Sequence, residues 1–482
     1  MAVSILVIDI GTTGIRCGIV HPDGHIEGLV HEVSAPNSPS PGLVEFDAAA
    51  MRDTILRLAR GVLADHHVSG IGIAAQRAST IAWDARTGEP LAPALGWQDL
   101  RTVGDCLTIR AETGISVAPN QTATKARWLL QACAAVDRSS IRIGTVDSWA
   151  AFVLSGNRLH ITDHTNAAVT GLYDASTGDW SELLLATFGI DRSMMPHIVD
   201  SSGPLGEATA LTGAPMIAGL VGDQQASLVG QACIQPGQAK ITFGTGGMLD
   251  VVTGHATPKS QARSTGGTFP IVAFAEARGL TWGAEAIMLS AGSNIEWLCS
   301  DMGILERPED SAAVAASVAD SAGVMYVPAL LGLGTPQWDY GARGTLLGLT
   351  RGSSRAHVVR AVLEGIAQRG ADLVDAAEAD TGVSIESLRV DGGMSRNSTF
   401  IEVLANATAR PIDVSPVTEA TTLGAAYLAG AACGTWSSLT EACALWSPSA
   451  RVAPTAHLDR QRWADAVERA AGWIPGLSTL DF

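Results

Sequence analysis

Two loops rich in glycine and threonine could hold phosphate groups. Residues 11–14 read GTTG after the apolar run ILVIDI, and residues 244–247 read GTGG after AKITF, about half the chain later. Such loops expose backbone N–H groups that can surround phosphate oxygens, and threonine hydroxyls add further donors. One loop alone is weak evidence. Two matching loops, with a third glycine turn at VDGG (390–393), favour a polyphosphate ligand shared between them.

Two aspartates accompany these loops. Asp9 comes just before the first loop, and Asp223 follows the apolar run MIAGLVG. An aspartate would repel a bare phosphate, whereas a Mg²⁺ ion between the two converts the repulsion into attraction. Asp223 is expected at the carboxyl end of a strand, where α/β proteins assemble their sites. Each aspartate could instead be an ordinary turn or helix-capping residue.

The composition excludes several classes of function. The 482 residues carry a formal net charge of −17 and include 31 lysines and arginines against 48 aspartates and glutamates. Nucleic acids and anionic membrane surfaces require a cationic face, so neither is expected as a partner. The three lysines are Lys125, Lys240 and Lys259, and none stands in a GxxxxGK[ST] frame, which excludes a P-loop nucleotide site.

The seven cysteines are scattered and never spaced CxxC. Neither a disulfide framework nor a zinc site is therefore expected, and a reducing cytoplasmic location fits best. The first apolar run is interrupted by Asp9 and has no basic residue before it, so it resembles neither a secretion signal nor a membrane span. His160 and His164 in HITDH could suggest a metal pair, but their surroundings look extended and metal ligation is not expected.

The elements that would position these residues begin with a hairpin. Residues 5–9 and 15–20 are predicted as its strands, followed by the turn HPDG and a third strand. Asp47 should cap a helix with apolar residues at helical spacing. Later strands are expected at 71–75, 79–83 and 141–147, with helices at 120–136 and 148–156. The mixture predicts an α/β half with a mixed sheet.

The second half opens like the first, with a strand, a glycine turn and a strand over 238–254. Later strands are expected at LRVD and RPIDVSP, and helices at NSTFIEVLANATA and EATTLGAAYLAGAACG. The repeated opening predicts a duplicated domain, with a nucleotide triphosphate held in the cleft between the copies. The join should fall near residues 231–237, which gives domains at 1–232 and 233–482.

The order of these motifs resembles a known family. The motifs occur in the order found in FGGY-family carbohydrate kinases, and their residues are most similar to those of the glycerol kinase branch. They are IDIGTTGIR, GLVEFD, GTVDSW, TDHTNA, GDQQASLVGQ, FGTGG, GLGTPQWDYGARG, VDGGMSRN and ATTLGAAYLAG. The resemblance covers about residues 4 to 435. It implies two actin-like, Hsp70-like (ribonuclease H-like) α/β domains, with mixed sheets flanked by helices and with ATP and substrate in the cleft between the domains.

The resemblance also implies roles for individual residues. Asp223 would be the general base that accepts a proton from the attacking hydroxyl, and Asp9 and Asp223 would help to hold Mg²⁺. The residues expected to bind ATP are Gly11, Thr12, Thr13 and Arg16 from the first half, Gly244 and Thr245 from the second, and Gly392, Gly393 and Asn397 at the adenosine. Arg343, in WDYGARG, could contact a ligand or form a structural ion pair.

The acceptor pocket is where the sequence departs from the branch. Arg77, Trp97, Asp223 and Gln224 match its substrate-binding set. The branch has glutamate, tyrosine and an aromatic residue where this chain has Ala78, Asn120 and Met248. All three changes remove bulk, and the first two also remove hydrogen-bonding groups. We therefore expect a pocket with room for a four- or five-carbon polyol or ketose.

Three alternatives remain open from the sequence. The protein could be a true glycerol kinase, or a pentulose kinase such as a xylulokinase. It could also be an actin- or Hsp70-like ATPase without sugar phosphorylation, although Arg77, Trp97 and Gln224 would then have no nucleotide role. The expected partner is a small polyol or sugar, and a homodimer or homotetramer is the default for the family.

Overall fold

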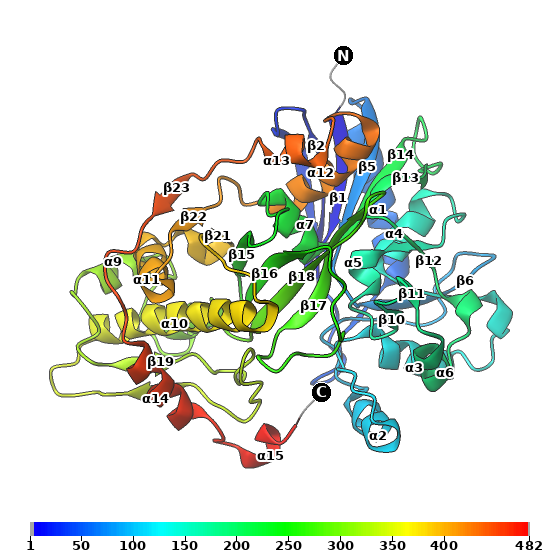
Figure 1. Ribbon diagram of the computed structural model, residues 1–482. Coiled ribbons are helices and arrows are strands. Elements are labelled where there is room, and N and C mark those ends of the chain that lie inside the picture. Colours follow the sequence, from blue (N-terminus) through cyan, green and yellow to red (C-terminus); the bar gives the residue numbers. More distant parts are fainter. Residues whose placement is uncertain (1–3, 481–482) are drawn as a thin grey trace.

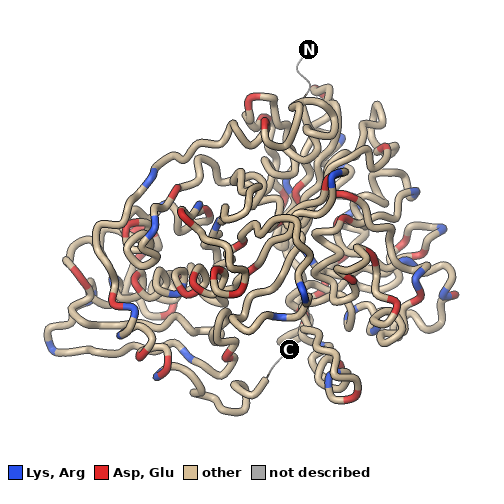
Figure 2. The backbone as a smooth tube through the Cα atoms, in the orientation of Figure 1, with Lys and Arg blue, Asp and Glu red and all other residues tan. Residues whose placement is uncertain are grey.

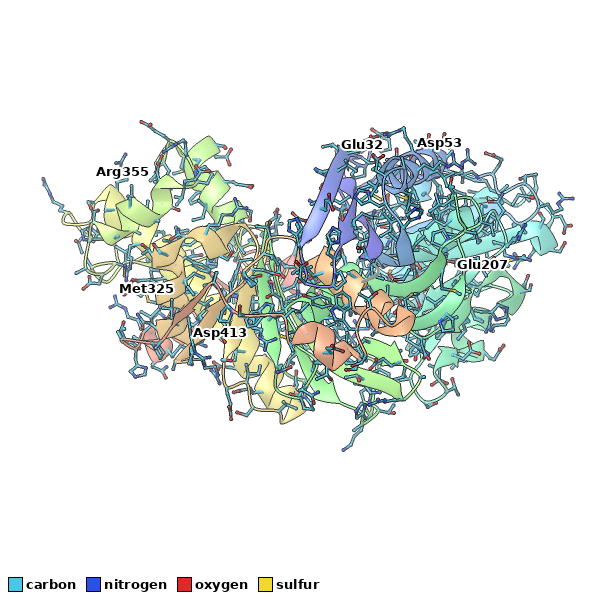
Figure 3. The ribbon with its side chains drawn as sticks, turned by 90° about the horizontal axis from the view of Figure 1, so that it is seen from above. Glu32, Asp53, Glu207, Met325, Arg355 and Asp413 are labelled. Carbon is cyan, nitrogen blue, oxygen red and sulfur yellow. The ribbon has the colours of Figure 1, made fainter. Side chains whose placement is uncertain are left out.

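The computed structural model describes residues 4–480 and divides the chain into two α/β halves. Each half is organised around one large sheet (Figure 1). Viewed from above, Glu32, Asp53 and Glu207 lie in one half, whereas Met325, Arg355 and Asp413 lie in the other (Figure 3). Acidic and basic positions are interspersed over both halves (Figure 2).

The first large sheet has the strand order β13-β14-β5-β1-β2-β3. Its strands are β1 (Ser4–Ile10), β2 (Gly14–Val20), β3 (Ile26–Val33), β5 (Val68–Ala75), β13 (Ser202–Glu207) and β14 (Met216–Gly222). β1 is buried along its whole length, as expected for a central strand of a sheet that is covered on both faces. β1 pairs antiparallel with β2 and parallel with β5, and β5 pairs parallel with β14.

The helices of this half cover its sheets. They are α1 (Ala48–Leu63), α2 (Val103–Thr113), α3 (Thr122–Ala132), α4 (Val146–Leu154), α5 (His164–Ala167), α6 (Glu182–Phe188) and α7 (Asp223–Gly230). Asp47 caps α1 by accepting from the backbone N–H groups of Ala49 and Ala50, as predicted. The shorter strands are β4 (Glu45–Phe46), β6 (Thr80–Asp84), β7 (Ala94–Leu95), β8 (Ile141–Thr145), β9 (Ile161–Asp163), β10 (Tyr173–Asp174), β11 (Asp179–Trp180) and β12 (His197–Val199).

The second large sheet has the order β17-β18-β16-β15-β21-β22-β23. Its strands are β15 (Ala239–Phe243), β16 (Gly247–Gly254), β17 (Phe269–Glu276), β18 (Gly279–Met288), β21 (Leu388–Asp391), β22 (Ile412–Val414) and β23 (Ala450–Val452). The run β18-β16-β15-β21-β22 has the same senses as β3-β2-β1-β5-β14, with two antiparallel pairings followed by two parallel ones. The repeated opening seen in the sequence therefore extends to a repeated topology.

Helices of the second half pack on both sheets. They are α8 (Ser293–Ser300), α9 (Asp310–Ala316), α10 (Arg355–Thr381), α11 (Ser398–Thr408), α12 (Ala420–Cys433), α13 (Leu439–Cys443), α14 (Arg460–Ala470) and α15 (Pro475–Ser478), with a small sheet of β19 (Met325–Val327) and β20 (Thr345–Leu347). Asn397 caps α11 by accepting from the N–H of Phe400. α10 runs through the second half beside α11 (Figure 1).

The two halves meet where α7 packs against α12. Glycines allow this close approach, because a Cβ atom on Gly230 would lie 1.9 Å from the Ala420 carbonyl oxygen and one on Gly424 would lie 1.8 Å from that of Ala226. α12 also contacts β1, β5 and β14, so this helix of the second half completes the core of the first. The contact holds the carboxyl ends of β1 and β14 beside the second sheet.

Most of the predicted elements are present, with small shifts. The strand expected at 141–147 ends at Thr145, because Val146 and Asp147 begin α4. The helix expected at 120–136 spans only 122–132. Residues 161–163, between the two histidines, form β9, as the extended surroundings predicted, whereas His164 itself begins the one-turn helix α5.

Candidate functional site

The first glycine loop is the turn between β1 and β2. The N–H of Gly11 donates to the carbonyl of Gly14 at 3.0 Å, which closes a tight turn around Thr12 and Thr13. Below the turn, Asp9 and Arg16 are directly opposite each other across the strand pair. Charged groups therefore stand directly under the loop that was predicted to bind phosphate.

The Asp9 carboxylate is buried among other charges. Arg16 lies 3.6 Å from it and also lies 3.5 Å from Glu419, which begins the turn into α12. Burial raises the pKa of Asp9 to about 7, the Arg16 charge opposes this rise, and the nearby carboxylates of Asp223 and Glu419 add to it. A cation placed beside Asp9 and Asp223 would relieve this repulsion. Carboxylate oxygens are the ligands that Mg²⁺ prefers, so the residues fit such an ion.

The second glycine loop is the turn between β15 and β16. The N–H of Gly244 donates to the carbonyl of Gly246 at 2.9 Å, which repeats the closure of the first loop. This loop is also held from outside, since Gly292 N–H donates to Gly244 and Ala291 N–H donates to Thr245, both at 2.8 Å. A Cβ atom on Gly292 would lie 2.6 Å from the Gly244 carbonyl oxygen. Gly292 was missed in the sequence, where the only available signal was the glycine just before a helix.

The residues predicted to contact adenosine follow β21. Gly392 has φ 86°, and a Cβ atom there would lie 2.4 Å from the Phe243 carbonyl oxygen, so only glycine fits. Gly393 is exposed, with open space beside its Cα. The side chain of Asn397 caps α11 and donates to the Ser311 hydroxyl at 3.0 Å. These residues thus lie one strand away from the second glycine loop, because β21 is the parallel neighbour of β15.

Asp223 lies at the end of β14 and begins α7, as predicted. Its Oδ1 accepts from the N–H of Gln224 at 2.8 Å, and Arg77 Nε lies 3.6 Å away. Burial raises the pKa of Asp223, and the Arg77 charge opposes the rise. A Cβ atom on Gly222 would lie 2.9 Å from the side chain of Arg77, so this glycine lets the arginine lie across the strand end.

Arg77 links the two halves. Its Nη2 donates to Glu285 of β18 at 2.6 Å, whereas its buried Nη1 has no hydrogen-bond partner among the described residues. Burial raises the pKa of Glu285, and the Arg77 charge opposes the rise. Glu285 was not identified in the sequence.

Three other acceptor-pocket candidates, Ala78, Trp97 and Asn120, lie on three loops of the first half. The indole Nε1 of Trp97 donates to the Thr12 hydroxyl at 3.0 Å, which connects the acceptor side with the first glycine loop. Lys125, which is fully buried, donates to the carbonyls of Asn120 at 2.8 Å and Trp97 at 3.5 Å. Ala78 is buried with φ 60°. The side chain of Asn120 is exposed.

A row of charged residues runs across the second sheet below these groups. Lys240, Asp250 and Glu285 are direct neighbours on β15, β16 and β18. Lys240 Nζ lies 2.9 Å from Asp250 and donates to the side-chain oxygens of Gln224 at 2.8 Å and Thr242 at 2.9 Å. Met248 is opposite Thr242, two residues along from Asp250 on the same strand. The sequence signal for this row was a lysine within an apolar strand.

Three further residues raised in the sequence lie outside this group of contacts. Arg343 donates to the backbone carbonyls of Tyr340 and Ala342. His160 bonds to the Ile143 carbonyl, and His164 bonds to the Tyr173 hydroxyl. Within residues 4–480, no cluster of three or more His, Cys, Asp or Glu side chains forms a metal site. No helix of that range is long and apolar enough to cross a membrane.

Comparison with known proteins identifies the family to which the chain belongs. The family model for the N-terminal domain of the FGGY family of carbohydrate kinases matches residues 4–230, and that for its C-terminal domain matches residues 239–433. A glycerol kinase from Janthinobacterium sp. (strain Marseille) is 42% identical, with an alignment that covers 98% of this chain and 100% of that protein. A glycerol kinase from Aromatoleum aromaticum is 40% identical and is covered over 99% of its length.

Solved structures have the same fold. A crystal structure of Plasmodium falciparum glycerol kinase with ADP superposes with a TM-score of 0.89 at 30% identity, covering 97% of this chain and 98% of that one. A "xyloylose kinase" from Brucella ovis gives a TM-score of 0.82 at 26% identity, covering 99% of both chains. The predicted class of two actin-like, Hsp70-like domains with mixed sheets flanked by helices is confirmed by these structures.

Proposed function

Because the chain belongs to the FGGY family of carbohydrate kinases, and is therefore a phosphotransferase with an alcohol acceptor, we propose that it transfers the γ-phosphoryl group of ATP to a primary hydroxyl of a small polyol or sugar. One observation carries the proposal. The carboxylate of Asp223 lies beside Arg77 at the junction of the two halves, and its charge is close enough to Asp9 to raise the pKa of that residue beneath the first glycine loop.

Asp223 acts as the general base. A hydroxyl group is a poor nucleophile at neutral pH, and a carboxylate within hydrogen-bond reach orients it and accepts its proton during the attack. The raised pKa of Asp223 makes the carboxylate a better proton acceptor than an exposed aspartate. The Arg77 charge opposes the rise in the pKa of Asp223, because it favours the ionised carboxylate.

The two glycine loops bind the triphosphate from opposite halves. Backbone N–H groups and hydroxyls surround the phosphate oxygens, which is what phosphoryl transfer requires of a protein: positioning and neutralisation of charge. The assigned residues are Gly11, Thr12, Thr13, Arg16, Gly244 and Thr245 at the phosphates, with Gly392, Gly393 and Asn397 at the adenosine. Gly292 supports the second loop from behind.

Asp9 and Asp223 would hold Mg²⁺. Bound there, the ion would neutralise phosphate charge. Two carboxylates are a small ligand set, and Mg²⁺ in kinases commonly takes its other ligands from phosphate oxygens and water. Arg16 shares the task of neutralisation, since it faces both Asp9 and Glu419.

The acceptor is larger than glycerol. Ala78, Asn120 and Met248 are smaller than the residues that the glycerol kinase branch uses at these positions, and the first two lack the carboxylate and the phenol hydroxyl found there. Glycerol is the second candidate, because several relatives at about 40% identity are named glycerol kinase. A coupled ADP-release assay over glycerol, erythritol, threitol, ribitol, xylitol, erythrulose, xylulose and ribulose separates the candidates. A clear preference for glycerol would overturn the larger acceptor.

A reversion series tests the same point from the protein side. Ala78→Glu, Asn120→Tyr and Met248→Phe, combined in one variant, should shift the ratio of kcat/KM toward glycerol by about tenfold or more. Unchanged ratios would show that these three positions do not set acceptor size. ADP release that ignores every acceptor would instead favour an ATPase without sugar phosphorylation.

The remaining assignments complete the proposal. The domains are taken as residues 1–232 and 233–482, with the nucleotide and acceptor between them. All seven cysteines are free, in keeping with a reducing cytoplasmic location. A homodimer or homotetramer is expected and can be checked by light scattering.

A further inference from the structure

The side-chain amide of Gln224 has a fixed orientation. Its Oε1 accepts a hydrogen bond from Lys240 Nζ at 2.8 Å. A lysine ammonium can only donate, so the oxygen of the amide must face Lys240 and the NH₂ group must face away. The half-buried Gln224 thus offers its NH₂ donors beside Asp223 rather than an acceptor.

The guanidinium of Arg77 is held in a similar way from the other half. Glu285 accepts a hydrogen bond from Nη2 at 2.6 Å, and Asp223 Oδ1 lies 3.6 Å from Nε. Nη1 is left buried without a partner among the described residues. An unpaired buried donor is costly, so a ligand oxygen that reaches it would be favoured strongly.

Lys240 and Glu285 belong to one charged row. Asp250 stands between them on the neighbouring strand and lies 2.9 Å from Lys240, and all three side chains are buried. The register of three adjacent strands therefore fixes the orientation of both proposed donors. Lys240 orients the amide of Gln224, and Glu285 orients the guanidinium of Arg77. In the same region the first half contributes Ala78, which carries no acceptor group.

We infer that Arg77 Nη1 and Gln224 Nε2 together recognise a ligand oxygen that accepts hydrogen bonds without donating one, so that the acceptor substrate is a ketose, bound through its carbonyl, in preference to the matching polyol. Lys240 and Glu285 are positioning residues for this recognition. The inference rests on the proposed function and names the substrate class of the same site.

The discrimination has a simple physical origin. An alcohol at the carbonyl position would bring a proton that needs an acceptor of its own. Asp223 is committed to the attacking hydroxyl, and Ala78 offers no side-chain acceptor. A hydroxyl proton that has no acceptor once the ligand is enclosed is penalised, whereas a carbonyl oxygen carries no proton.

Matched ketone and alcohol pairs test the inference. Dihydroxyacetone against glycerol, erythrulose against erythritol and threitol, and xylulose against xylitol differ at one carbon within each length. We expect kcat/KM to favour the ketone by about tenfold at the length that is used best. Equal or better use of the polyol would overturn the inference while leaving the kinase assignment intact. Absence of phosphorylation with every compound would overturn the proposed function as well.

Gln224→Glu tests the donor directly. The change is nearly isosteric and leaves an oxygen facing Lys240, but it replaces the NH₂ group by a second oxygen, which removes the proposed donor. The ketone preference should fall about tenfold toward parity. A preference that stays at the wild-type value would contradict the assignment of Gln224.

The double variant Lys240→Met/Asp250→Leu tests the positioning role. It replaces a buried ion pair by apolar side chains of similar size, a change that folded proteins often tolerate. With the amide released, KM for the ketose should rise about tenfold while kcat stays within about threefold. Lys259→Met, at an exposed lysine, is the control and should change neither constant. A folded double variant with the wild-type KM would show that Lys240 does not position Gln224 for substrate recognition.

Discussion

The two glycine loops share a turn but differ in their surroundings. In the loop of residues 11–14, charged side chains lie beneath the turn, and Trp97 of the acceptor side bonds to Thr12. The loop of residues 244–247 is held mainly by backbone groups, through the N–H groups of Ala291 and Gly292. The repeated hairpin thus gives each half a similar glycine turn, and the two turns differ in the residues that contact them from outside. In the proposed mechanism, the first loop is coupled to the chemistry and the acceptor, and the second positions the nucleotide.

The largest effect should come from Asp223→Asn. The amide cannot accept the hydroxyl proton, so turnover should fall at least about 100-fold. ADP affinity, measured by calorimetry, should change little, because nucleotide binding depends mainly on the glycine loops. Near-normal turnover would show that the base lies elsewhere and would remove the chemical distinction between the two halves.

A second variant isolates the other loop. Gly292→Ala places a Cβ atom 2.6 Å from the Gly244 carbonyl and must displace the loop that Gly292 supports. KM for ATP should rise about tenfold or more, with a smaller change in KM for the acceptor. Gly104→Ala, in α2 with open space around it, is the matched control. An equal rise in both KM values would mean that the second loop does not serve the nucleotide alone.

The acceptor side depends on Lys125, whose burial lowers its pKa to about 7. Below pH 7 the folded protein must bury the charged lysine. Between pH 7 and about 10.5 the unfolded chain binds the proton that the folded protein has released, so this penalty is relieved as the pH rises. Relative to Lys125→Met, the wild type should therefore gain about 1 kcal/mol of unfolding free energy per pH unit from pH 7 to 9.

Denaturant unfolding of both proteins at several pH values measures this difference. A constant difference across pH 6 to 9 would mean that Lys125 stays charged when buried. In either case the variant should bind the acceptor more weakly, since Lys125 ties the carbonyls of Asn120 and Trp97 together.

The smallest effect concerns the link between acceptor side and first loop. Trp97→Phe keeps an aromatic face but removes the indole hydrogen bond to Thr12. Loss of one such bond corresponds to about a threefold to tenfold change. We expect ADP release without acceptor to rise by about threefold relative to acceptor phosphorylation. A ratio that matches the wild type would show that the bond does not couple the two sides.

Local patterns in the sequence predicted most of the elements that surround the candidate site. The hairpins of residues 4–20 and 239–254, the Asp47 cap and the strand end before Asp223 all depend on neighbours in the chain, and all are present. Asn397 was predicted beside the adenosine from its motif. The structure adds that its side chain caps α11, a role that its place before an apolar helix also indicates.

The charged row could not be predicted in the same way. Lys240, Asp250 and Glu285 meet only because three strands pair in one register, which nothing local to any of them fixes. Gly292 and Glu419 likewise approach the glycine loops from distant segments. The 27-residue helix α10 was also missed, because its many buried positions leave no clear apolar stripe.

A crystal structure with ADP and Mg²⁺ tests the whole account most directly. We predict that one nucleotide contacts both loops, with its phosphates near Thr12 and Thr245 and its adenosine beside Gly392 and Gly393. A nucleotide that touches only one half, or that binds away from both loops, would contradict it.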